Sequence, residues 1–184
     1  MSFLLRFMRV ILGAWLGKRR ALHEPSRLFI RVWPNDLDLN IHMNNGRYLT
    51  LMDLGRMDMM LRTGAMRLWL GKGWQPLVAL SMCRHFKALR CFQSFELRTT
   101  VLGWDEKWVY FEQRFLRGDD LYALAVVKAL MASQEGPVPT QTLFQELNFH
   151  HQFPHSPALP DWVQSWLAAE RQAITQLKAE RAKA

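Results

Sequence analysis

Residues 34 to 48, with the sequence PNDLDLNIHMNNGRY, place two aspartates, four asparagines and a histidine between two apolar runs. A carboxylate can act as a general base or nucleophile, and a histidine with an unperturbed pKa near ~6.5 exchanges protons at neutral pH. The same residue types form Asx turns and cap helices without doing any chemistry. We interpret the stretch as a turn with a helix cap that also carries a reaction centre.

The elements on either side must hold this turn in place. Residues 27 to 33, RLFIRVW, alternate in polarity and are rich in β-formers, which predicts a strand that ends at Pro34. A long helix follows, with Asn44 and Asn45 where its N-cap is needed and Gly64 as its stop. Its spacing predicts a buried face with a glycine for close approach to a sheet, formed by Tyr48, Leu51, Met52, Gly55 and Met59.

The rest of the chain is read as a meander of antiparallel strands and a final helix. The predicted strands cover residues 77–89, 93–104, 107–117 and 121–134, although the last also contains many good helix formers. Residues 160–184 have apolar positions at helical intervals and predict an amphipathic helix that frays at its end. We therefore divide the chain into an N-terminal helix (1–22), a central domain (23–158) and a C-terminal helix (159–184).

Composition narrows the class of protein. A chain of 184 residues with 49% hydrophobic content forms one globular domain with a real core. The formal net charge of +8 suits an acidic partner, but no nucleic-acid-binding signature accompanies it, so nucleic acid is not expected. Two cysteines, Cys83 and Cys91, indicate free thiols in a reducing, cytoplasmic compartment. His150, His151 and His155 lack the spacing of a metal site, so no metal is expected.

The N-terminal segment MSFLLRFMRVILGAWLGKRR is too short and too interrupted by arginines to span a bilayer. On a helical projection Arg6, Arg9 and Gly13 share one narrow side, and apolar residues cover the remainder. This pattern fits a helix lying in a membrane interface, with residues 18–20 at anionic headgroups. It fits equally well a helix packed on the body of the protein or on a second subunit.

Strand, polar turn, long helix and antiparallel strands follow one another as in an α+β fold whose curved sheet wraps one helix. The run DLDLNIHMNNGRYLTLMD resembles the signature of hotdog-fold thioesterases and is similar to plant acyl-carrier-protein thioesterases. With LGWDEKWVYFEQRF at 102–115, the pattern also resembles thioesterase superfamily member 6 and proteins like 4-hydroxybenzoyl-CoA thioesterase. The likeness covers roughly residues 27–135.

The resemblance implies roles for individual residues. Asp38 takes the position of the general base or nucleophile, and the backbone N–H of Asn45 is the donor to the thioester carbonyl. Asn40 and His42 take supporting positions, in which Asn40 positions water or the carboxylate and His42 orients Asp38 or relays a proton. Residues expected to line the substrate are Asn44, Tyr48, Met52, Met82 and Cys83.

One departure separates this chain from the plant enzymes. They carry a further glutamate on the next strand, where this sequence reads SMCRHF and has Met82, Cys83 or His85 instead. Cys83 as a nucleophile is the alternative, although a strand cysteine is usually a small buried hydrophobe.

The resemblance implies hydrolysis of an acyl-CoA or acyl-carrier-protein thioester without a cofactor. It also implies a homodimer or higher homo-oligomer, because hotdog active sites form between subunits. The other candidate function is a non-catalytic acyl-binding or membrane-associated scaffold with the same fold. The localisation expected is cytoplasmic, with a peripheral membrane contact through residues 1–20 as the open alternative.

Overall fold

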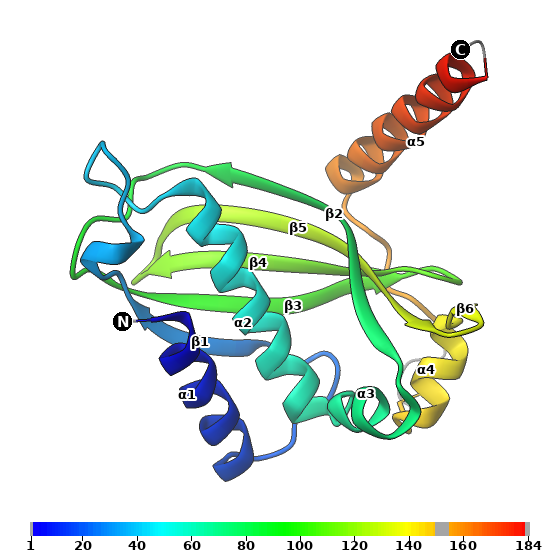
Figure 1. Ribbon diagram of the computed structural model, residues 1–184, viewed down its shortest axis with the longest axis horizontal. Coiled ribbons are helices and arrows are strands. Elements are labelled where there is room, and N and C mark those ends of the chain that lie inside the picture. Colours follow the sequence, from blue (N-terminus) through cyan, green and yellow to red (C-terminus); the bar gives the residue numbers. More distant parts are fainter. Residues whose placement is uncertain (1, 150–154, 183–184) are drawn as a thin grey trace.

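The computed structural model describes residues 2–149 and 155–182, and shows one curved sheet wrapped around a helix (Figure 1). The elements in chain order are α1 (Phe3–Leu16), β1 (Ser26–Arg31), the 3-10 turn η1 (Pro34–Asp36), α2 (Asn45–Thr63), α3 (Met66–Lys72), β2 (Gln75–His85), β3 (Ser94–Trp104), β4 (Val109–Arg117), β5 (Asp120–Ser133), β6 (Gly136–Pro137), α4 (Thr140–Glu146) and α5 (Asp161–Arg181). The sequence predicted α1, β1, α2, four of the later strands and α5, but missed α3, α4 and β6.

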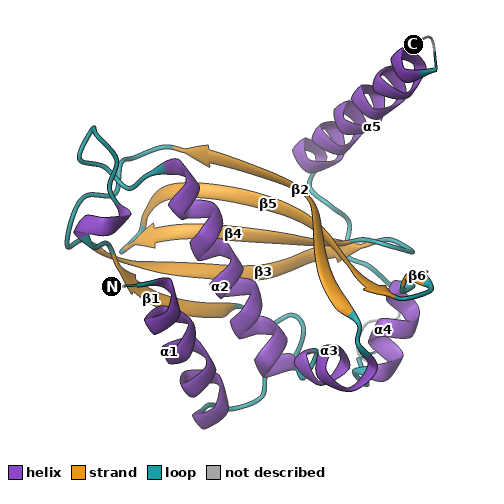
Figure 2. Cartoon of the chain, viewed as in Figure 1, coloured by secondary structure: helices purple, strands orange, loops and turns teal. Residues whose placement is uncertain are grey.

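The sheet is antiparallel, with the strand order β1-β3-β4-β5-β2, and β6 pairs with the end of β5. Figure 2 shows its strands curling over α2, with α1 beside α2 on the same side. This is the α+β hotdog arrangement expected from the sequence. Strands β1 and β2 are therefore the two edge strands of the sheet.

Helix α2 begins where the sequence predicted. The side chain of Asn44 accepts a hydrogen bond from the amide of Gly46, at 2.8 Å, and Gly64 closes the helix with φ +84°. Gly55 faces the sheet so closely that a Cβ there would lie 2.4 Å from the Thr99 hydroxyl oxygen. The predicted close approach is confirmed.

Hydrogen bonds join α2 to the sheet beneath it. The Nε2 atom of Gln113 donates to the Met52 carbonyl and to the Thr99 hydroxyl, both at 2.9 Å. Gln113 and Thr99 are fully buried, so these bonds satisfy polar groups within the core. The core around them includes Tyr48, Leu51, Met52, Leu54, Phe95, Leu97 and Phe115.

Helix α5 packs on the sheet only through its first turns. Val163 and Leu167 are buried against Tyr110 and Val126, whereas every residue from 171 to 180 is exposed. The predicted apolar face is therefore only partly covered, and Leu177 is 57% exposed. In Figure 1 the helix projects away from the sheet.

Candidate active site

The polar stretch that follows β1 forms a short hairpin. Its arms are held by a bridge between Leu37 and Met43 and by a hydrogen bond of 2.9 Å from the Asp38 amide to the His42 carbonyl. At the tip, the Ile41 amide donates to the Asp38 carbonyl at 3.1 Å, with Ile41 at φ +59°. The sequence predicted a turn here, and the hairpin places Asp38 and His42 opposite each other.

The carboxylate of Asp38 is bound within this hairpin. Its Oδ1 atom accepts a hydrogen bond from the Asn40 amide at 2.9 Å, which is an Asx turn. Asp38 and His42 are half-buried, and the side chain of Asn40 is exposed. Asn40 thus contacts Asp38 through its main chain.

The hairpin is also bound to the loop that follows β2, at Leu89 and Arg90. The Met43 amide donates to the Leu89 carbonyl at 2.8 Å, and His42 forms a bridge with Arg90. The bridge pairs the main chains of His42 and Arg90, and the Arg90 side chain is exposed. Nothing in the local sequence around Arg90 signals this proximity.

The N-terminus of α2 comes directly after the hairpin. Asn44 accepts from the Gly46 amide through its side chain and from the Arg47 amide through its carbonyl, both at 2.8 Å. The amide of Asn45, the first helical residue, has no acceptor among the described residues. First-turn amides and the helix dipole favour negative charge. The site therefore contains a free N–H donor close behind the hairpin that carries Asp38.

Tyr48 lies one turn further along α2 and joins it to β2. Its ring is 2% exposed and meets the His85 ring edge-on, with the centroids 4.4 Å apart. Burial raises the pKa of Tyr48 to about 12. Tyr48 therefore stays protonated at neutral pH, and its ring packs between the start of α2 and β2.

Cys83 and His85 are adjacent on one face of β2, with 3.5 Å between Sγ and Nε2. Burial raises the pKa of Cys83 to about 11 and lowers the pKa of His85. A neutral thiol next to a neutral imidazole is not an activated nucleophile. No three His, Cys, Asp or Glu side chains of the described residues gather as metal ligands; His150 and His151 lie outside that set.

Asp36, the first aspartate of the motif, is structural. It is fully buried and binds Arg6 of α1 through both carboxylate oxygens, and it also accepts from the Trp33 amide at 2.9 Å. Burial alone would raise its pKa. The bonds from Arg6 and Trp33, with the charges of Arg6 and Arg47, outweigh burial and hold the pKa below its usual value.

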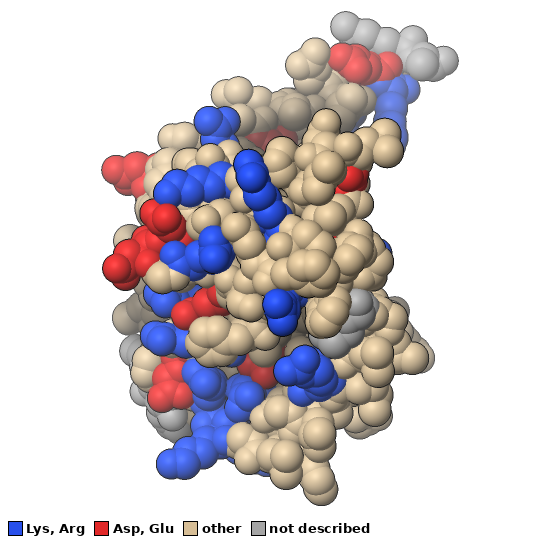
Figure 3. All heavy atoms as spheres, turned by 90° about the vertical axis from the view of Figure 1, so that its left-hand side faces the viewer, with Lys and Arg blue, Asp and Glu red and all other residues tan. Residues whose placement is uncertain are grey.

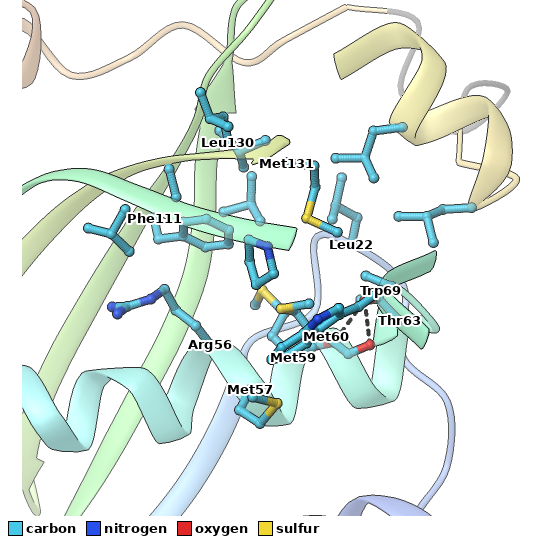
Figure 4. A pocket seen from close by; sticks show the side chains of 18 of the residues that line it. Leu22, Arg56, Met57, Met59, Met60, Thr63, Trp69, Phe111, Leu130 and Met131 are labelled. Carbon is cyan, nitrogen blue, oxygen red and sulfur yellow. Dashed lines mark hydrogen bonds between the residues drawn. The ribbon is translucent and has the colours of Figure 1, made fainter. Parts of the chain in front are cut away.

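An apolar cavity of about 240 Å³ lies between the second half of α2 and the sheet (Figure 4). Met57, Met59 and Met60 line it from α2, opposite Phe111 and Met131 of the sheet. Helices α3 and α4, which the sequence did not predict, add Trp69, Leu143 and Phe144.

None of the five residues expected to line the substrate, Asn44, Tyr48, Met52, Met82 and Cys83, lines this cavity. Met52 is 1% exposed and belongs to the central core. Met82 and Cys83 lie on β2 at the Tyr48 end of α2, whereas Pro76 and Val78 of the same strand line the cavity. The helix rises 1.5 Å per residue, so Asn45 and Arg56, which borders the cavity, lie roughly 17 Å apart along α2. Within one chain, the expected catalytic loop and the apolar cavity occupy opposite ends of the helix.

Comparisons with known proteins agree with this fold. A family model described as the thioesterase-like superfamily matches residues 32–167. The chain is 34% identical to Protein THEM6 of Xenopus laevis over 151 residues, which cover 81% of this chain and 70% of that protein.

Solved structures give the same result for the fold. Gentisyl-coenzyme A thioesterase BH1999 superposes with a TM-score of 0.59 at 17% identity, covering 65% of this chain and 98% of the other. The hypothetical protein SAV2348 of Staphylococcus aureus, solved in complex with CoA, superposes with a TM-score of 0.62 at 12% identity over 79% of this chain and 96% of its own. Because the family model spans most of the chain and a relative agrees across most of both sequences, this protein belongs to the thioesterase-like superfamily and is a thioester hydrolase.

Proposed function

We propose that this protein hydrolyses an acyl-CoA thioester with Asp38 as general base or nucleophile and the Asn45 amide as the donor to the thioester oxygen. The observation that carries the proposal is the Asn45 N–H, which has no acceptor among the described residues and begins α2 directly after the hairpin that contains Asp38. His42 pairs with Asp38 across the hairpin through its main-chain carbonyl, and in this proposal its imidazole exchanges a proton with Asp38 or with water.

The chemistry suits these groups. With Asp38 as base, the carboxylate takes a proton from water as the water oxygen attacks the carbonyl carbon. Negative charge then develops on the carbonyl oxygen, where the Asn45 N–H and the dipole of α2 stabilise it. The C–S bond breaks to release the thiolate, which needs little acid assistance because a thiol pKa lies near ~8.5.

The surroundings of the site favour CoA as the carrier. The hairpin end of the molecule carries the exposed arginines Arg31, Arg84 and Arg90, with Arg47 in the first turn of α2. Figure 3, which faces this end, shows many Lys and Arg side chains, with Asp and Glu side chains among them. The phosphates of CoA would find cationic partners there, and two structures of this fold are named for a CoA thioester or solved with CoA.

We further propose that the working unit is a homodimer paired through β2. This strand lies at the edge of the sheet, and Leu77 and Val78 on it are 49% and 48% exposed. Antiparallel pairing of two β2 strands about a twofold axis sets the His85 end of one copy beside the Gln75 end of the other. The cavity mouth at Pro76 and Val78 would then lie beside the second copy's helix N-terminus, so that the acyl tail enters one subunit while its thioester reacts at the other.

The test is thiol release from acetyl-, hexanoyl-, lauroyl-, palmitoyl- and benzoyl-CoA, with the same acyl groups on acyl carrier protein for comparison. The proposal expects turnover of CoA thioesters, with the aliphatic chains preferred because the cavity is apolar. Turnover confined to the carrier protein would contradict the choice of CoA. No turnover with either carrier would contradict hydrolysis and leave acyl binding as the function.

A further inference from the structure

Helix α1 turns Arg6 and Val10 toward the protein. Arg6 is 5% exposed and donates to both oxygens of Asp36 and, at 3.0 Å, to the Arg31 carbonyl. One turn later Val10 is 7% exposed, and the Gly13 carbonyl accepts from Nη2 of Arg62 at 3.1 Å. Arg6 and Val10 are therefore packed on β1 and α2, whereas Arg9, which shares the narrow polar side with Arg6, is exposed.

The opposite side of α1 consists of exposed apolar side chains. At 100° per residue, Leu4, Met8 and Trp15 face away from Arg6 and Gly13, and Leu5, Leu12 and Leu16 continue this surface toward Arg9. The exposed fractions are 65% for Leu4, 57% for Leu5, 55% for Met8, 54% for Leu12, 81% for Trp15 and 74% for Leu16. So many large apolar groups on one continuous helix face indicate an interaction surface rather than scattered surface residues.

A dimer paired through β2 would leave this surface open. Helix α1 packs beside α2 at the β1 edge of the sheet, and β2 forms the other edge (Figure 1). The proposed second copy therefore meets the molecule far from Trp15. The outer side of α1 is therefore left for a different partner.

Charge at the end of the helix identifies the chemistry of that partner. Lys18, Arg19 and Arg20 follow α1 directly, and residues 1–27 contain six basic residues against one acidic residue. No helix of the described residues is long and apolar enough to cross a bilayer. A short apolar helix face followed by a basic cluster matches the interface of an anionic phospholipid membrane.

We propose that α1 docks this protein on the surface of an anionic phospholipid bilayer. The outer side chains enter the boundary between headgroups and acyl chains, and the exposed Lys18 and Arg19 bind the phosphates. Because the Arg6–Asp36 ion pair ties α1 to the residue two positions before Asp38, the docked helix also holds the catalytic hairpin near the membrane surface. The choice of a membrane over a second copy rests on the dimer proposed above, whereas binding of α1 to vesicles does not depend on the thioester chemistry.

Cosedimentation of the full chain with vesicles tests the proposal, with phosphatidylcholine alone compared with phosphatidylcholine containing about 30% phosphatidylglycerol. Deletion of α1 is unsuitable because it would also remove Arg6 and Val10, which are buried against the rest of the protein. Trp15→Glu changes only the outer side. Its matched control is Leu70→Glu, since Leu70 is also 81% exposed on a helix but lies on α3. Circular dichroism verifies that both variants are folded.

We expect wild type and Leu70→Glu to pellet with the anionic vesicles and Trp15→Glu to remain in the supernatant. Each basic residue near an anionic surface contributes about fivefold to partitioning, so replacing the exposed Lys18 and Arg19 with glutamine should weaken binding on the order of twentyfold. Equal pelleting of wild type and Trp15→Glu would overturn the proposal. A second pair of results would also overturn it: wild type does not bind vesicles, and Trp15→Glu dissociates an oligomer that wild type forms in solution. A second copy would then cover α1.

Discussion

Substitution of Asp36 should lower stability, whereas substitution of Asp38 should lower catalysis, although only one residue lies between them. Asp36 is fully buried and neutralises Arg6, which is 5% exposed. Asp36→Asn leaves that guanidinium buried without a counter-charge, a change that costs about 3 to 5 kcal/mol. For a domain of this size each kcal/mol moves Tm by about 2 to 4 °C, so a loss of about 6 to 20 °C is expected.

Asp38→Asn is the control. The carboxylate of Asp38 is half-buried and accepts one hydrogen bond from the Asn40 amide, which a carboxamide oxygen can keep. We expect a free-energy change below about 1 kcal/mol for this variant. Thermal unfolding followed by circular dichroism measures both variants. The reasoning fails if Asp36→Asn melts within a few degrees of wild type, or if Asp38→Asn is the less stable of the two.

The unfolding free energy measured at acidic pH gives a second test of the Arg6–Asp36 ion pair. The pKa of Asp36 in the folded protein lies below the value of 3.8 that applies when the chain is unfolded. Its stabilising contribution is therefore fully present above about pH 4 and is lost as the pH falls through the folded-state pKa. The gap in unfolding free energy between wild type and Asp36→Asn should narrow in that range.

Three further changes test the packing, the nucleophile and the cavity. Gly55→Ala places a Cβ 2.4 Å from Thr99 and should cost at least about 1 to 3 kcal/mol in urea unfolding, whereas Gly71→Ala, with nothing within 4 Å, should be neutral or stabilising. Cys83→Ala should retain turnover within about threefold, since the thiol pKa of about 11 leaves little thiolate; loss of all activity would make it the nucleophile. Ala129→Leu narrows the cavity and should shift the kcat/KM preference toward shorter acyl chains; an unchanged preference would place the acyl tail elsewhere.

Much of the fold could be predicted from local patterns, because those patterns have local causes. The alternation of β1, the cap at Asn44 and the stop at Gly64 are each set by neighbouring residues. The β5 segment was ambiguous because its alanines favour a helix. In the structure Ala123 and Ala125 are fully buried in the core packed beneath α2, so tertiary packing decides the strand.

The parts that were missed depend on contacts distant in sequence or lack a start signal. Helices α3 and α4 have seven residues each, and neither Ala65 nor Pro139 at their N-caps offers a capping side chain. The apolar cavity that α3 and α4 help to line was therefore not predicted from the sequence. The orientation of α1 depends on the pairing of Arg6 with Asp36, thirty positions away, which helical periodicity cannot reveal.

The candidate site was predicted in part. The turn, the helix cap and the first-turn amide of Asn45 follow from residue types and order. The contact of Cys83 with His85 follows from alternation on a strand, but its burial, and hence the neutral thiol, depends on the fold. The bridge between His42 and Arg90 joins two loops that no sequence pattern connects.

The most direct test of the account is kcat for thiol release from the preferred acyl-CoA by wild type and by Asp38→Asn, at the same pH and with both variants verified as folded. The account predicts a loss of about a thousandfold or more in kcat, with little change in KM, because the base or nucleophile is removed while the binding surfaces remain. An Asp38→Asn variant that keeps kcat within about tenfold of wild type would contradict the assignment of Asp38.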